Sequence, residues 1–196
     1  QLLLDSYRMF AQFLVNIVRM PNLDTEWVKK NVHCSFSERF LEIQRKNPGK
    51  GTLLLTGHLG MFEFISWYYG SIGYPPAVIA RELKNPVMDR WWNSIRERSG
   101  VSVIPRTGSF RKSLKFIQEG RSVGIVFDQN VTRNNAVFVP LFGRPAATTI
   151  APGFIAVSSQ CPIIVHGIRQ IDFDHYELDA VECDLQDIYD HPGLTR

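Results

Sequence analysis

Short apolar or alternating runs bounded by glycine, proline or polar residues recur along the chain from residue 50 onwards. Runs of this kind are typical of strands that lie in a protein core. We predict strands at 52–57, 77–80, 101–104, 122–127, 162–168 and 176–182. Segments with a helical apolar pattern lie between them, at 62–69, 85–98, 109–118 and 148–160. Strands that alternate with helices predict an α/β fold with a mixed, mostly parallel central sheet flanked by helices.

Two further helices are predicted before residue 50. The first, over residues 2–19, is apolar around most of its circumference. Such a segment is most often a core helix, and an interfacial membrane helix is the alternative because Arg8 and Arg19 suit a bilayer surface. The second, over residues 27–46, is charged and amphipathic and ends before Pro48. We interpret it as one solvated helix that covers the sheet.

Polar residues lie just after four of the predicted strands, namely His58, Arg81, Arg106 (after Pro105) and Asp128. Parallel strands bring their carboxyl ends to one edge of a sheet, where ligands bind in open α/β folds. Arg81 and Arg106 carry the planar donor group that binds phosphate or carboxylate. Asp128 either holds one of these arginines in place or belongs with Gln129 to a polar turn. A further apolar loop, at 139–144, either walls a hydrophobic channel or is a packed turn.

His58 is the candidate general base, because Glu63 follows it where a strand gives way to a helix. Within one continuous helix, residues five positions apart would point about 140° away from each other. If His58 precedes the helix, the Glu63 carboxylate can reach back to it, since helical side chains lean toward the amino terminus. A carboxylate on one ring nitrogen leaves the other free to accept a proton from a hydroxyl. The alternative is a hydrogen-bonded structural histidine, which is how we interpret His166 on its apolar strand.

The amino-acid composition excludes few classes of protein. The chain has 196 residues, of which 44% are hydrophobic, and this is enough for one sizeable core. The net charge of +3 is compatible with an anionic partner or a membrane surface and requires neither. Its three cysteines are widely separated, so neither a zinc site nor a disulfide framework is indicated and a reducing compartment is expected. No apolar run approaches the roughly 20 residues that span a bilayer.

Several common catalytic motifs are missing from the sequence. It contains no G-x-S-x-G nucleophile elbow, no G-x-x-x-x-G-K-[ST] phosphate loop, no G-x-G-x-x-G and no H-E-x-x-H. The sequence therefore does not favour assignment of this chain to the serine hydrolases, P-loop NTPases, Rossmann oxidoreductases or zincins.

The stretch Gly-His-Leu-Gly-Met-Phe-Glu at 57–63 resembles the H-x-x-x-x-[DE] signature of the glycerolipid acyltransferase superfamily. Other segments resemble the lipid A late (lauroyl/myristoyl) acyltransferase family within that superfamily, in order and in approximate spacing. These segments lie at 80–86, 104–106, 124–129 and 139–148. The ordered set is more specific than the short motif alone. The family often has Asn-Trp-Glu where this chain has Met-Phe-Glu at 61–63, so the acceptor contacts are expected to differ.

The resemblance implies that an acyl chain moves from an acyl-carrier-protein or acyl-CoA thioester to a hydroxyl of a lipid A precursor or related glycolipid. His58 is implied as the general base, with Glu63 orienting it, and Arg81 as a ligand of the acceptor phosphate. Further substrate contacts are predicted for Asn85, Arg106, Asp128 and Gln129. The resemblance implies no metal, no cofactor, no covalent acyl-enzyme and no nucleic-acid partner.

It also implies a place at the cytoplasmic face of the inner membrane, held peripherally or by an anchor absent from this sequence. The sequence begins at Gln1 and ends at Arg196. We interpret it as a single acyltransferase domain, present as a fragment that lacks an upstream membrane helix and the family's C-terminal end. Within it we expect a helical part at 1–48 and an α/β core at 50–183. A non-catalytic lipid- or carrier-binding protein on the same fold is the alternative, and a thioesterase that uses His58 on water is a weaker one.

Overall fold

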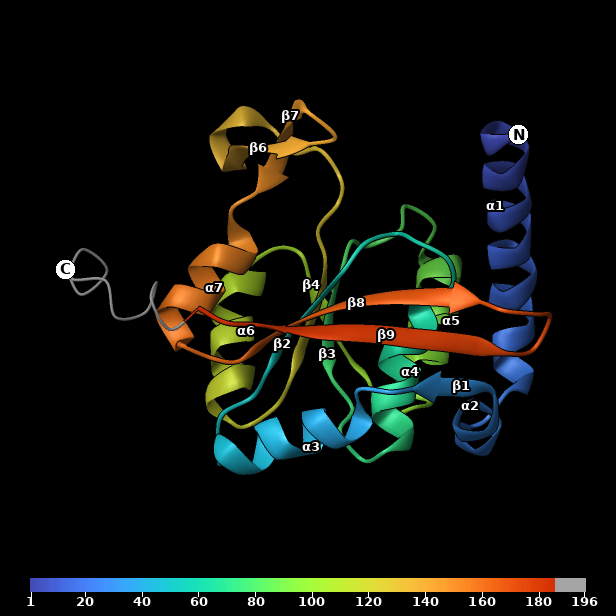
Figure 1. Ribbon diagram of the computed structural model, residues 1–196, viewed down its shortest axis with the longest axis horizontal. Coiled ribbons are helices and arrows are strands. Elements are labelled where there is room, and N and C mark those ends of the chain that lie inside the picture. Colours follow the sequence, from blue (N-terminus) through green and yellow to red (C-terminus); the bar gives the residue numbers. More distant parts are fainter. Residues whose placement is uncertain (186–196) are drawn as a thin grey trace.

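The computed structural model describes residues 1–185, which form a seven-stranded sheet with helices on both faces (Figure 1). The strand order is β1-β9-β8-β2-β5-β3-β4. The last five strands in this order are mutually parallel, whereas β9 and β1 run in the opposite direction. The predicted α/β fold with a mixed, mostly parallel sheet is therefore confirmed. The strands are β1 (Val32–Cys34), β2 (Leu53–Thr56), β3 (Ala77–Ala80), β4 (Ser102–Pro105), β5 (Val123–Val126), β8 (Ile163–Gln170) and β9 (Tyr176–Cys183).

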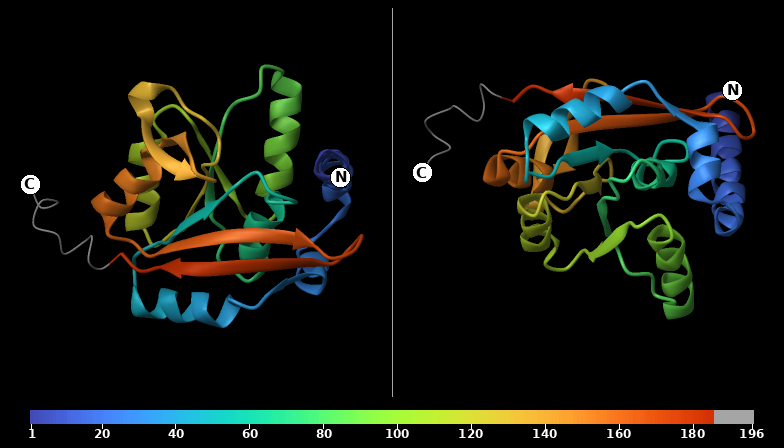
Figure 2. Two further views of the ribbon diagram at one scale, coloured as in Figure 1. Left: turned by 45° about the horizontal axis from the view of Figure 1, so that its top comes forward. Right: turned by 90° about the horizontal axis from the view of Figure 1, so that it is seen from below.

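Two hydrophobic cores lie against the two faces of the sheet. The larger one is built by helices α1 to α5, and the smaller one by α6 and α7 (Figure 2). β2 contributes to both, because Leu54 packs in the first core while Leu53 and Leu55 pack in the second. Successive side chains of a strand point to opposite faces, so a strand covered on both faces is apolar throughout. The helices are α1 (Leu2–Arg19), α2 (Thr25–Asn31), α3 (Ser37–Lys46), α4 (Glu63–Ser71), α5 (Pro86–Glu97), α6 (Ser109–Gln118) and α7 (Ala151–Ser159).

The chain leaves the two central neighbours β2 and β5 toward opposite sides of the sheet. From β2 it passes through α4 to β3, and from β5 it passes through α7 to β8 on the other side of β2. Diverging connections leave a crevice outside the carboxyl ends of the two strands, which is where ligands bind in doubly wound folds. The strand order therefore places the expected site between β2 and β5.

Three predicted elements differ from the structure. The single helix at 27–46 is wrong, because β1 interrupts it and pairs with β9, so the part before residue 48 is not helical throughout. The loop at 139–144 is also wrong, because β6 (Ala136–Leu141) and β7 (Arg144–Thr149) form an antiparallel hairpin. The helix at 148–160 starts later, at Ala151, since its first residues belong to β7. In each case an apolar segment finds a strand partner that lies far away in sequence or across a tight turn, and apolar spacing alone does not reveal such a partner.

α1 packs on the larger core at its carboxyl-terminal end, where Ile17 is buried. Apolar side chains nearer its beginning, such as Leu3 and Tyr7, are exposed to solvent. Within residues 1–185, no helix has both the length and the apolar character needed to span a bilayer.

His166 is a buried core histidine, as predicted, and its Nε2 lies 2.6 Å from the hydroxyl of Tyr69. Burial lowers the pKa of His166 from 6.5 to about 4, so the ring is neutral at pH 7 and shares a hydrogen bond with the Tyr69 hydroxyl. Between these two values the unfolded chain binds a proton that the folded chain does not. Folding stability is therefore fully present above the unfolded pKa and is lost as the pH falls through this range, by about 3 kcal/mol for this group.

Urea unfolding between pH 7.5 and pH 4.5 tests this expectation. His166→Phe is expected to be less stable than the wild type at pH 7.5, because Tyr69 loses its partner. Its free energy of unfolding is also expected to fall less steeply toward acid. Equal slopes in the two proteins would show that another group controls the acid sensitivity.

Candidate functional site

The crevice between β2 and β5 brings His58 and Asp128 together. Thr56 of β2 is paired with Val126 of β5, and the backbone N–H of Phe127 donates to the carbonyl of Thr56 at 3.1 Å. His58 and Asp128 each follow their strand by two residues, so the pairing places them opposite each other. Two residues that are 70 positions apart in sequence thus meet at the carboxyl edge of the sheet.

Asp128 binds His58 through both carboxylate oxygens. Its Oδ1 lies 2.7 Å from His58 Nδ1, and its Oδ2 accepts the backbone N–H of His58 at 2.7 Å. Burial alone would raise the pKa of Asp128, but these hydrogen bonds from His58 outweigh it and leave the pKa below its ordinary value. An ionised Asp128 requires a proton on Nδ1, which leaves Nε2 of a neutral ring as the free acceptor.

Gly57 allows this close approach of Asp128. A Cβ atom built on Gly57 would lie 3.0 Å from Asp128 Oδ2, the oxygen that accepts the backbone N–H of His58. A side chain at this position would push the carboxylate away from the imidazole. The glycine before His58 therefore contributes to the geometry of the pair.

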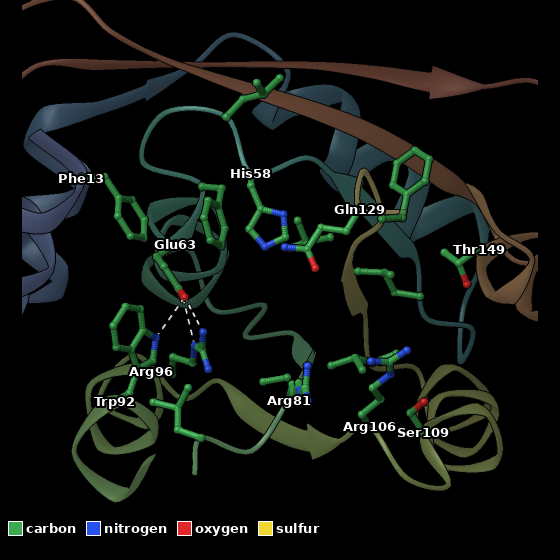
Figure 3. A pocket seen from close by; sticks show the side chains of 18 of the residues that line it. Phe13, His58, Glu63, Arg81, Trp92, Arg96, Arg106, Ser109, Gln129 and Thr149 are labelled. Carbon is green, nitrogen blue, oxygen red and sulfur yellow. Dashed lines mark hydrogen bonds and ion pairs between the residues drawn. The ribbon is translucent and has the colours of Figure 1, made fainter. Parts of the chain in front are cut away.

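Glu63 does not take the position that we predicted for it. It is buried at the start of α4, and its carboxylate accepts hydrogen bonds from two side chains of α5 (Figure 3). Arg96 Nε donates to Oε2 at 3.0 Å, Arg96 Nη2 donates to Oε1, and Trp92 Nε1 donates to Oε1 at 3.2 Å. The predicted contact between Glu63 and His58 is therefore wrong in this structure, and the carboxylate beside the imidazole belongs to Asp128.

A cavity of about 830 Å³ opens in front of His58. Figure 3 shows His58 and Gln129 on one side of it, with Arg81 and Arg106 on the other. Both arginines are exposed, and within residues 1–185 neither guanidinium forms an ion pair with a carboxylate, so both are available to an anionic ligand. The structure thus brings together four of the residues that the sequence predicted.

Asn85 and Asp128 make contacts within the protein, and the substrate contacts predicted for them stay predictions. The Asn85 side-chain oxygen caps α5 by accepting the backbone N–H groups of Val87 at 2.9 Å and Met88 at 3.3 Å. It is not among the residues that line the cavity. Asp128 holds His58 and forms no ion pair with Arg81 or Arg106 in the described part of the chain.

Sequence reasoning missed several cavity residues. Phe13 of α1, Trp92 and Arg96 of α5, and Thr149 of β7 all line it (Figure 3). These side chains occupy ordinary positions of an amphipathic helix or a short strand, so no local pattern distinguishes them. Among residues 1–185, no three His, Cys, Asp or Glu side chains gather as a metal-binding group.

The arrangement is suited to moving a proton from a bound hydroxyl. A neutral imidazole held on one nitrogen by a carboxylate can act as a general base through the other nitrogen. The basic side of the cavity can hold an anionic group near that base, while Phe13, Ile79 and other apolar residues supply surface for a hydrophobic one.

The sequence of this chain is similar to those of known proteins. The sequence pattern of the bacterial lipid A biosynthesis acyltransferase family matches residues 1–188. Lipid A biosynthesis acyltransferase 2 of Shigella flexneri is 26% identical over 159 residues, which make up 80% of this chain and 50% of that protein. The chain thus spans about half the length of this curated relative. The match to the family extends over nearly the whole sequence and confirms the predicted resemblance, so this chain belongs to the bacterial lipid A biosynthesis acyltransferase family.

Proposed function

We propose that the protein transfers a fatty acyl chain from a thioester donor to a hydroxyl group of a lipid A precursor or related glycolipid. The donor is an acyl-carrier protein or acyl-CoA thioester, and the reaction takes place at the cytoplasmic face of the inner membrane. The observation that carries the proposal is the His58–Asp128 pair at the wall of a cavity with two arginines that form no ion pair within residues 1–185. Membership of the family supports it.

In the proposed reaction His58 Nε2 takes the proton of the acceptor hydroxyl. The hydroxyl oxygen attacks the thioester carbonyl, and a C–O bond forms as the carbonyl electrons move to its oxygen. When the tetrahedral intermediate collapses, the C–S bond breaks and the departing thiolate takes the proton from the imidazolium. Asp128 keeps the ring in the required tautomer and stabilises its positive charge while the proton is held there.

The other residues of the site bind and position in this proposal. Arg81 and Arg106 bind the phosphate of the acceptor, and Gln129 lies beside the reacting groups as a hydrogen-bonding partner. Glu63 acts as a positioning residue, because its pair with Arg96 ties the start of α4 to α5 and fixes one wall of the cavity. This role replaces the direct orientation of His58 that the sequence suggested.

Mass spectrometry of the acceptor tests the proposal. The full-length protein in detergent would be given an acyl-carrier-protein or acyl-CoA thioester with a lipid A precursor, a phosphatidylinositol mannoside or a lysophospholipid. We expect the lipid A precursor to gain one acyl group with the wild type and none with His58→Gln. Removing the acceptor phosphates is expected to raise KM about tenfold, because the two arginines lose their ligand.

Two results would contradict the proposal. Free fatty acid released at the same rate with and without any acceptor would indicate a thioesterase. Tight binding of donor or lipid without any mass gain, equal in the wild type and His58→Gln, would indicate a non-catalytic binding protein.

A further inference from the structure

The β6–β7 hairpin ends in an aromatic side chain that solvent surrounds almost completely. Phe142 is 98% exposed and has a φ angle of 49°. It is the first residue of a two-residue turn between the paired residues Leu141 and Arg144, and Gly143 follows it with a φ of 76°. Such turns strongly favour asparagine or glycine at the first position, because other residues adopt a positive φ at a cost. A strained and exposed phenylalanine therefore indicates that this side chain contacts something other than the protein's own core.

Apolar side chains cover both faces of the hairpin. Val137, Phe138, Val139 and Leu141 of β6 are all exposed, although consecutive residues of a strand point to opposite faces. A protein partner that lay on one face would leave the other face in water. A hydrocarbon medium would cover both faces at once, so the pattern favours immersion over one-sided docking.

Near the tip, both edges of the hairpin are unsuited to pairing with another strand. Pro140 and Pro145 lie directly opposite each other, one pair away from the residues that flank the turn. At this position the backbone groups of both strands point outward, and proline supplies no N–H there. This blocks the edges near the tip against strand addition, which is a common way for a protein partner to bind a hairpin.

The charges around the hairpin suit an anionic surface. Between Asp128 and Asp172 the sequence contains no Asp or Glu. Arg144 at the turn and Arg133 at the base are both exposed. Cations beside an apolar tip are complementary to acidic lipid headgroups above a hydrocarbon interior.

The hairpin rises from the rim of the cavity. It connects the carboxyl end of β5 with α7, so it stands on the same edge of the sheet as His58 (Figure 1). Thr149 of β7 and Val131, whose N–H donates to the carbonyl of Ala147, line the cavity at the base of the hairpin. A surface that the tip contacts therefore lies on the same side of the molecule as the entrance to the site.

We propose that the tip of the β6–β7 hairpin inserts into an anionic lipid bilayer and presents the cavity mouth to the membrane surface. The lipid acceptor then reaches His58 from the bilayer without crossing water. This inference rests on the proposed function for the identity of the acceptor, but the insertion itself can be measured without any acyl transfer.

Depth-dependent quenching tests the insertion. The full-length protein, in a Cys183→Ser background, would carry a fluorophore on Phe142→Cys, since Cys34 and Cys161 are buried. It would be bound to vesicles of phosphatidylethanolamine and phosphatidylglycerol with brominated acyl chains. We expect strong quenching of this label, and none of a label on Val181→Cys, which is 59% exposed on β9 and does not line the cavity.

Phe142→Asn gives a matched functional test. Asparagine before glycine suits this turn best, so the variant keeps the hairpin while it removes the aromatic ring. We expect KM for an acceptor presented in vesicles to rise on the order of tenfold, as for the loss of one buried phenylalanine. In detergent, where no bilayer has to be entered, KM is expected to remain unchanged.

Two outcomes would overturn the inference. An unquenched label at position 142 would show that the hairpin stays in water. If the fluorescence of this label is unchanged by vesicles but changes when acyl-carrier protein is added, the hairpin binds a protein and not the bilayer. If the label is quenched and no acceptor gains mass, the proposed function fails while insertion stands.

Discussion

Replacing Asp128 with asparagine is expected to lower kcat/KM for acyl transfer on the order of ten-thousandfold, the loss seen when a catalytic histidine is held in the wrong tautomer. The backbone N–H of His58 can only donate, so the amide oxygen of the introduced asparagine must face it. The amide NH₂ group then faces His58 Nδ1 and donates to it. The ring proton moves to Nε2, which is the nitrogen that has to accept the proton of the hydroxyl.

Steady-state kinetics on Asp128→Asn and three further variants would distinguish the roles of the two carboxylates. His58→Gln and the double variant His58→Gln/Asp128→Asn are expected to be about equally inactive, because residues that act as a unit are not additive. Glu63→Gln is expected to retain kcat/KM within about tenfold of the wild type, since it acts only through the cavity wall. A thousandfold loss in Glu63→Gln with little loss in Asp128→Asn would instead restore Glu63 as the residue that orients His58.

Replacing Arg96 with methionine is expected to destabilise the protein by about 3 kcal/mol, because it leaves a buried carboxylate without its cation. Glu63 is 5% exposed and Arg96 retains 15% of its side-chain exposure, so the pair is only weakly screened by water. Trp92 would be the remaining donor to the Glu63 carboxylate among the contacts of the described chain. Urea unfolding at pH 7.5 measures the loss.

The double variant Glu63→Gln/Arg96→Met provides the control for this prediction. Because it removes both charges together, we expect it to recover most of the lost stability. Arg39→Met serves as the matched surface variant, since Arg39 pairs with Glu42 and Glu182 in solvent and its loss should be barely measurable. If Arg96→Met is as stable as Arg39→Met, the buried pair contributes little and Glu63 does not depend on it.

Figure 3 shows why the predicted contact between Glu63 and His58 is wrong, since Glu63 points to Arg96 and Trp92 instead. At the start of a helix a carboxylate can turn back toward the preceding turn or sideways to a neighbouring helix, and both positions are sterically open. The choice depends on α5, whose Arg96 lies 33 positions further along the chain. Local spacing contains no information on that helix, so the direction of Glu63 was not predictable from it.

The pattern of apolar and polar residues along the sequence was enough to predict most of the helices and strands. It also predicted the edge of the sheet on which the site lies. Apolar runs on both faces predicted the central strands, such as 52–57, since burial from both sides removes the polar alternation. A histidine after one strand and an aspartate after another were visible as candidates. β1 was not visible, because a strand of three residues depends on the partner that completes its hydrogen bonds. The hairpin was not visible either, because its exposed strands lack the burial pattern that the central strands have.

Only the tertiary structure decided which candidates meet. The order of the strands makes β2 and β5 neighbours, and their register sets His58 against Asp128. Strand order follows from how the helices pack on the two faces, and this is a property of the whole core that no single segment encodes. The sequence therefore supplied the reactive groups, and the packing of distant elements selected Asp128 as the partner of the base and Arg96 as the partner of Glu63.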